Sequence, residues 1–169
     1  TKVNTFKRKK SVVLHIGKQS KCKQTCPTLK FHKHDMKKVE STKYLGDIIT
    51  SAGGAKESVE SRRNKGWGKI AEIAGIVVEM PYEHKIEIGL KMRDSKLCNG
   101  MLFSTEAWTS ISDKEMDRME QVDLALLKTL VKGHSKCNKA FYYLEFGVIP
   151  IRFMIRNRRL MFHQHLISR

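Results

Sequence analysis

The side chains best suited to chemistry in this sequence are basic, and one ordered array lies near the C-terminus. Arg152, Arg156 and Arg159 stand at positions i, i+4 and i+7, and His163 follows four residues later. On a helix these four side chains share one face. We interpret this face as a ridge that follows phosphates, although a solvated basic face would have the same pattern.

A second group of side chains could bind a metal ion. Cys22 and Cys26 precede His32 and His34, and two thiolates with two imidazoles would complete a tetrahedral zinc site. The two histidines are only one residue apart, however, whereas zinc-finger ligands are more widely spaced. We therefore predict no metal site, with unpaired surface residues in a hairpin as the favoured interpretation and zinc binding as the alternative.

Motifs for catalysis are missing from the sequence. It contains no nucleotide-binding glycine loop, no His-Glu-x-x-His helix and no nucleophile elbow. Two-metal phosphoryl transfer needs clustered carboxylates, but the aspartates are scattered, and Asp113 and Asp117 follow a helix start where acids suit the helix dipole. We expect the chain to be catalytically silent by itself. The scattered aspartates are Asp35, Asp47, Asp113, Asp117 and Asp123.

The elements that must position the basic residues change in type along the chain. The first third favours short strands at 11–16, 28–31 and 44–49, and Gly53-Gly54 ends this part. After it, apolar residues recur with a helical period, and Pro81 ends the first helix. The predicted fold class is α+β, a small antiparallel sheet followed by a helical bundle. The helices are expected at 55–79, 82–103, 113–132, 136–146 and from 150 onward.

Particular residues support these helix boundaries. Ser112 and Glu115 form a capping box, and Gly133 suits the end of the helix that starts there. Pro150 is compatible with the first turn of the last helix. Trp67 and Trp108 are large apolar side chains on this lobe, and we expect both to lie in the core, with stacking of either ring on a base as the alternative.

The composition narrows the class of partner. The 169 residues include 33 Lys+Arg and 17 Asp+Glu, a net charge of +16, which attracts polyanions such as nucleic acid. The apolar runs are too short for a membrane span. The four cysteines lie at irregular spacing, which favours reduced thiols and a nuclear or cytoplasmic protein. The first residue is Thr1 rather than Met, so we expect a piece of a longer polypeptide.

Several stretches, read in order, match one known pattern. These are Lys-Ser-Val-Val-Leu-His-Ile-Gly at 10–17, Thr-Lys-Tyr-Leu-Gly-Asp-Ile-Ile at 42–49 before Gly53-Gly54, Thr-Glu-Ala-Trp at 105–108 and Ala-Phe-Tyr-Tyr-Leu-Glu-Phe-Gly-Val-Ile-Pro at 140–150. Together with Arg-Arg-Leu at 158–160, they resemble the end of the reverse transcriptase domain of non-LTR, LINE-type retrotransposons. The resemblance covers nearly the whole chain.

The resemblance implies a division of the chain. Residues 1–54 would be the closing strands of the polymerase palm, 55–133 the helical thumb, and 134–169 a helical segment beyond the thumb. The parent protein would be an RNA-directed DNA polymerase that uses Mg²⁺, while this chain would hold no cofactor. Its partners would be an RNA–DNA hybrid or template RNA, and the upstream palm and fingers of the same polypeptide. The metal-binding aspartates of the family precede these segments, so the chain alone is expected to be inactive.

The resemblance also implies roles for particular residues. Lys10 corresponds to the lysine of motif D, a candidate proton donor to the pyrophosphate leaving group, although the family's Asn three residues earlier is missing. The primer grip, a hairpin that positions the 3′ end of the growing strand, would comprise Lys43, Tyr44, Leu45 and Gly46. The alternative is that Tyr44 and Leu45 are core residues and that Gly46 forms a bulge. Lys43 can meet a phosphate, and Gly46 permits close approach of a backbone.

The first helix of the implied thumb would contact the duplex. Gly66 and Gly68 would leave room for a minor groove, and shape-based binding of a hybrid suits such a face. The alternative function is an independent basic nucleic-acid-binding or zinc-binding module, or an inactive remnant of a retroelement. The predicted nucleic-acid-binding residues are Arg62, Arg63, Lys65, Lys69, Arg152, Arg156 and Arg159.

Overall fold

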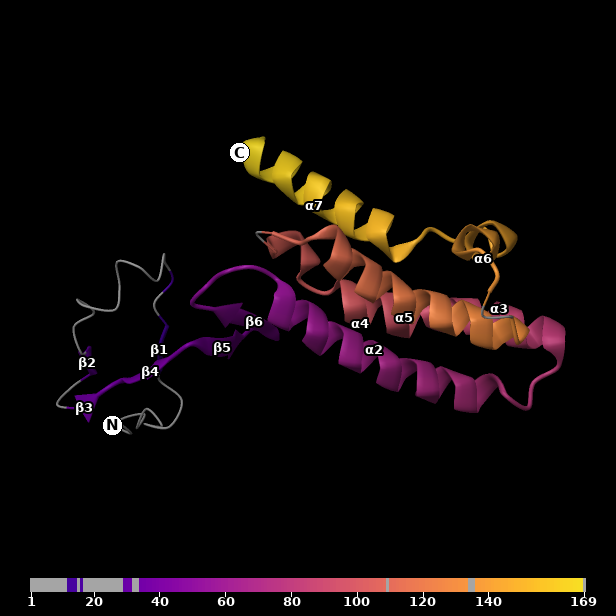
Figure 1. Cartoon of the computed structure of the whole chain (residues 1–169), viewed down its shortest axis with the longest axis horizontal. Coiled ribbons are helices and arrows are strands. Elements are labelled where there is room, and N and C mark those ends of the chain that lie inside the picture. The colour runs from indigo at the N-terminus through magenta and orange to yellow at the C-terminus, as the bar shows by residue number, and fades with distance from the viewer. Residues whose placement is uncertain are drawn as a thin grey trace, which may run out of the picture.

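The chain folds as short strands followed by a bundle of helices, as the α+β prediction stated (Figure 1). The computed structural model describes residues 12–14, 16, 29–31, 34–108, 110–133 and 136–168. Within these residues the strands form three two-stranded sheets. The strands are β1 Val12–Leu14, β2 Lys30–Phe31, β3 His34–Asp35, β4 Lys37–Val39, β5 Ser41–Tyr44 and β6 Asp47–Thr50.

The pairing of the strands differs from the predicted antiparallel sheet in two ways. β1 pairs with β4 in parallel, with Val12 opposite Lys37, whereas β2–β3 and β5–β6 are antiparallel. The predicted strand at 44–49 is instead interrupted by a turn at Leu45-Gly46, so β5 and β6 make a hairpin. Both central residues have positive φ angles, which is the geometry of a tight two-residue hairpin turn.

The helical lobe follows the predicted order of helices. The second predicted helix is one run of helical residues, and its middle part, η2, is a π-helix. In a π-helix the backbone hydrogen bonds join residues five apart instead of four. The helical elements are α2 Lys56–Val77, α3 Tyr82–Met92, η2 Arg93–Cys98, α4 Asn99–Leu102, the 3₁₀ turn η3 Thr105–Ala107, α5 Asp113–Val131, α6 Lys139–Glu145 and α7 Ile151–Ile167.

The predicted helix ends are confirmed where side chains define them. Ser112 Oγ accepts a hydrogen bond from the Glu115 amide, and the Glu115 carboxylate accepts one from the Ser112 amide, as a capping box requires. Lys132, at φ 52°, ends α5 in the left-handed region, directly before Gly133. Pro150 lies at the cap position immediately before α7.

The core lies between α5 and the helices around it. Ile73 of α2, Leu126 of α5 and Ile155 of α7 are fully buried and belong to one apolar cluster. α2 lies beside α5 along its length, and α7 crosses above α5 before it extends toward the C-terminus (Figure 1). Trp108 is buried as predicted, but Trp67 is 41% exposed, so its prediction as a core residue was wrong.

Candidate nucleic-acid interface

The tip of the β5–β6 hairpin presents apolar side chains to solvent. Tyr44 is 62% exposed and Leu45 is 77% exposed. Leu45 has φ 47°, a left-handed conformation that is unfavourable for a leucine, and Gly46 follows with φ 88°. Strain of this kind concentrates at functional sites. The turn therefore holds an exposed leucine where burial does not explain its presence.

Hydrogen bonds attach the residues after the turn to two parts of the helical lobe, the segment 104–108 and α2. The Asp47 carboxylate accepts hydrogen bonds from Trp108 Nε1 at 2.9 Å and from Ser104 Oγ at 3.3 Å. Ser58 of α2 bonds both backbone groups of Ile48, accepting from its amide and donating to its carbonyl oxygen. The sequence pattern gave no indication of these contacts, which join the 42–49 and 105–108 stretches in space.

Arg62 has a different role from the predicted contact with a duplex. It is only 5% exposed, its Nη2 donates to the Gly46 carbonyl oxygen at 3.1 Å, and its guanidinium stacks on the Phe103 ring with 4.9 Å to the centroid. The enclosed guanidinium of Arg62 therefore supports the turn from inside the molecule. It does not reach solvent, as a direct contact with a duplex would require.

Lys43 and Lys65 are the predicted cations that remain exposed beside the tip. Partial burial lowers the pKa of Lys65, and the positive charges of Arg62 and Lys43 lower it further, against an opposing effect of Asp47. Within the described part of the chain, neither lysine forms an ion pair with a carboxylate. An anion between these like charges would relieve their repulsion. We call Lys43, Tyr44, Leu45 and Lys65 the hairpin surface.

The other predicted cations of α2 have acidic neighbours. Arg63 pairs with Glu60 at 2.8 Å, and Lys69 pairs with Glu72 at 2.6 Å. Lys96 binds the second oxygen of Glu72, and these hydrogen bonds lower the pKa of that carboxyl to about 2. The positive charges of Arg63 and Lys69 are therefore largely compensated by neighbouring carboxylates.

Gly66 and Gly68 of α2 have different surroundings. A Cβ on Gly66 would lie 2.8 Å from Val122 and 2.9 Å from Met101, so this glycine allows close packing with α5 and α4. Gly66 is buried, but it also lines a groove beside Gly68, so its predicted role at a minor groove stays a prediction. A Cβ on Gly68 would meet no atom within 4 Å. Gly68 borders a shallow groove with Lys65, Lys69 and Gly100, and it remains compatible with an approaching backbone.

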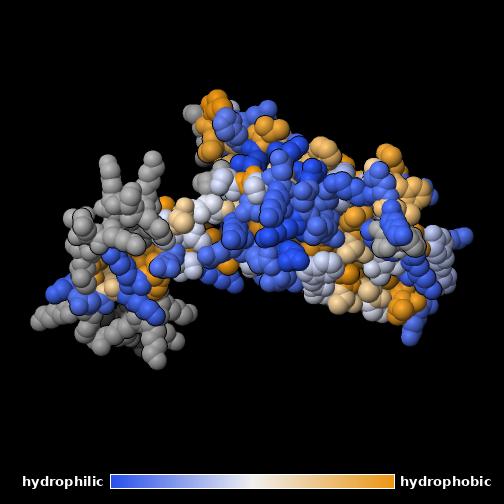
Figure 2. Space-filling view, in the orientation of Figure 1, coloured by the Kyte–Doolittle hydropathy of each residue, from blue (hydrophilic) through white to orange (hydrophobic). Residues whose placement is uncertain are grey.

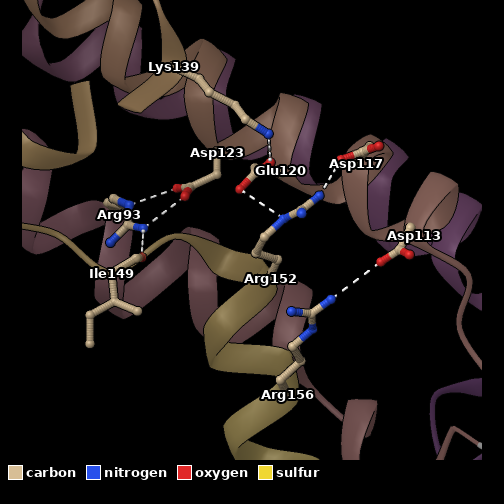
Figure 3. A network of polar contacts seen from close by, with 9 residues as sticks. All are labelled: Arg93, Asp113, Asp117, Glu120, Asp123, Lys139, Ile149, Arg152 and Arg156. Carbon is tan, nitrogen blue, oxygen red and sulfur yellow. Dashed lines mark hydrogen bonds and ion pairs between the residues drawn. The ribbon is translucent and has the colours of Figure 1, made fainter. Parts of the chain in front are cut away.

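The predicted ridge on α7 is turned toward acidic residues of α5 (Figure 3). Arg152 bonds Asp117 and lies 3.2 Å from Glu120, and Arg156 bonds Asp113 at 3.3 Å. Two acids compensate the charge of Arg152, which is 21% exposed, so a phosphate contact is disfavoured for this residue. Arg156 and Asp113 are both exposed, and the predicted phosphate contact of Arg156 stays a prediction. Asp113 and Asp117 therefore act as ion-pair partners, and Asp113 also lies in the first turn of α5.

A buried ion pair in the same region was not predicted. Arg93 of η2 is 2% exposed and contacts Asp123 with two nitrogens, at 2.7 and 2.8 Å, while Asp123 is fully buried. Arg93 also donates to the Ile149 carbonyl oxygen at 2.8 Å, just before α7 (Figure 3). Burial opposes the charged guanidinium, but the bonds and charge of Asp123 hold the Arg93 pKa above its usual range. We call the pairs of Arg93, Arg152 and Arg156 the α5–α7 network.

The remaining predicted sites lie partly outside the described residues. Lys10, Cys22, Cys26 and His32 fall there, and the motif D prediction stays untested. Among the residues that the structure describes, no three His, Cys, Asp or Glu side chains come together as a metal site would require. Every helix described in the structure is too short or too polar to cross a bilayer.

Comparison with protein-family models, with curated proteins and with solved structures finds no match for this chain.

Proposed function

We propose that this chain binds the template–primer duplex, an RNA–DNA hybrid, as part of an RNA-directed DNA polymerase of a LINE-like retroelement. The observation that supports the proposal is the hairpin surface. There an exposed, strained turn stands beside two lysines that lack a carboxylate partner among the described residues. Lysines of this kind bind phosphates, and exposed apolar side chains contact sugars or base faces.

The fastening of the turn supports a positioning role over nonspecific adhesion. Arg62, Asp47 and Trp108 hold the turn against the bundle, so the tip is pre-organised on rigid elements. A duplex held there would take a defined orientation relative to α2. In this proposal the chain's residues bind and orient nucleic acid, and none forms or breaks a bond.

The proposal is tested by measuring the affinity of the full chain for a blunt RNA–DNA hybrid across a salt series. Each lysine–phosphate contact contributes a slope of about 0.7 to 0.9 in the plot of log affinity against log salt. The double variant Lys43→Gln/Lys65→Gln should therefore lower the slope by roughly 1.5. A salt-independent affinity in the wild type would overturn the proposal.

A matched control separates local contact from net charge. The double variant Lys85→Gln/Lys132→Gln removes the same charge from two lysines that also form no ion pair with a carboxylate in the described residues. Lys85 belongs to α3, which lies at the opposite end of α2 from the hairpin (Figure 1). We expect this control to leave the slope within experimental error of the wild type. Equal slopes for the two double variants would place the binding surface elsewhere.

A further inference from the structure

A second groove lies between the η3 segment and the outer half of α7. Glu106 and Trp108 line one side, while Arg156, Arg159, Phe162 and His163 contribute from α7. It encloses about 660 Å³. Apolar surface is gathered at the C-terminal end of α7, whereas the middle of the bundle is mostly hydrophilic on the face shown in Figure 2. The groove therefore combines aromatic rings with guanidinium groups at its edge.

One carboxylate in this groove lacks a hydrogen-bond donor. Glu106 Oε2 is shielded from solvent and has no hydrogen-bond partner among the described residues. A buried carboxylate oxygen without a donor is unfavourable, so the position favours a ligand that brings an N–H group. Among the described residues, Arg156 on the same groove pairs with the exposed Asp113 at 3.3 Å. An exposed pair of this kind is weak, and a phosphate can compete for the guanidinium.

We infer that this groove binds a single-stranded nucleic-acid segment, with one unpaired base stacked on its aromatic side chains. A base has flat apolar faces for Phe162 and His163, and its phosphates suit Arg156 and Arg159. Bases with an exocyclic amino group can donate to Glu106, as cytosine does to acidic side chains. An apolar protein helix would leave the Glu106 oxygen unpaired, and an acidic peptide would be repelled by it.

The position of the groove relates it to the hairpin surface. The side chain of Trp108 lines the groove, while its indole N–H donates to Asp47 directly after the hairpin turn. Trp108 therefore contacts both regions, and in the proposal a strand that leaves a duplex held at the hairpin would continue to the groove. This part of the inference rests on the proposed function, whereas binding of an isolated single strand does not.

The test compares a blunt RNA–DNA hybrid, the same hybrid with a single-stranded extension of about six nucleotides, and the extension alone, by fluorescence anisotropy. A dC extension should raise the affinity for the hybrid about tenfold, since stacking of one base contributes about 1–3 kcal/mol. A dT extension, which has no exocyclic amino group, should raise it less. The isolated dC strand should bind better than the isolated dT strand.

Variants assign the effect to the groove. Phe162→Ala should abolish the gain from the extension and leave the affinity for the blunt hybrid unchanged. Phe153→Ala removes an exposed aromatic ring from α7 outside the groove and should leave both affinities unchanged. Glu106→Gln should remove the preference for dC over dT, because the neutral amide can also donate to thymine carbonyl groups.

The outcomes separate the two proposals. Equal affinity for blunt and extended hybrids, with no binding of the isolated dC strand, overturns the groove and leaves duplex binding in place. Loss of blunt-hybrid binding with retained binding of the isolated dC strand overturns duplex binding and leaves the groove in place. Should Phe162→Ala change only the self-association of the chain in sedimentation, the groove is a protein interface and the inference fails.

Discussion

The hairpin surface and the α5–α7 network contain the same kinds of side chain in opposite circumstances. Lys43 and Lys65 stand beside an exposed turn, with no carboxylate paired to them in the described part of the chain. Arg152 and Arg156 face acids one helix away. This difference shows that regularly spaced basic residues on one helix do not establish a phosphate site. Acidic residues on the neighbouring helix can already compensate the charge.

We expect the largest effect on stability from breaking the buried Arg93–Asp123 pair of the α5–α7 network. Asp123→Asn leaves the enclosed Arg93 without its counter-charge, and we expect the free energy of unfolding to fall by about 3–5 kcal/mol in urea denaturation. Asp94→Asn is the control, since Asp94 also pairs with Arg93 but is 65% exposed. Its loss should cost less than about 1 kcal/mol. Equal effects of the two substitutions would contradict the distinction.

Substitutions of Gly66 and Gly68 test which face of α2 packs against the bundle. Gly66→Ala should destabilise the fold by about 1–3 kcal/mol, because the new methyl group overlaps Val122 and Met101. Gly68→Ala should instead stabilise the helix by roughly 0.5–1 kcal/mol, since its methyl group meets open space. Thermal unfolding of both variants measures this. A stable Gly66→Ala protein would mean that α2 and α5 pack less closely than described.

The attachment of the hairpin to the bundle can be loosened by one substitution. Trp108→Phe keeps the ring but removes the indole donor to Asp47, and we expect a loss of about 1–2 kcal/mol in the free energy of unfolding. Affinity for the blunt hybrid should fall as well, because the tip is then less pre-organised. Unchanged affinity at reduced stability would confine Trp108 to a structural role.

The smallest expected effect concerns Glu72, which pairs with Lys69 of α2 and Lys96 of η2. The pKa of Glu72 lies at about 2, below its ordinary value of 4.5, so its contribution to stability is complete above pH 4.5 and is lost as the pH falls toward 2. Glu72→Gln should therefore flatten the acid branch of the stability curve between these values. The carboxyl is exposed, so we expect a slight effect, measured by urea titrations at several pH values. An identical acid branch in the Glu72→Gln variant would show that Lys69 and Lys96 do not lower the pKa of Glu72.

Much of the fold could be predicted from local sequence patterns. The helical period with Pro81, the Ser112–Glu115 capping box and Pro150 located the helix boundaries because caps and breakers act within a few residues. The residue pattern predicted a strand through the turn at Leu45-Gly46, since leucine rarely adopts a positive φ angle, whereas the resemblance implied a hairpin at these residues. The parallel pairing of β1 with β4 was also missed, because partners distant in sequence have no local signature.

The sequence by itself determined the positive charge, the order of the helices and the set of basic residues that could meet phosphate. Only the tertiary structure decided which of those residues remain available. It buried Arg62 under the hairpin turn and placed two acids of α5 against Arg152, while Lys43 and Lys65 stayed exposed. The physical reason is that charge compensation and desolvation depend on distances between elements, and those distances arise only when the helices pack.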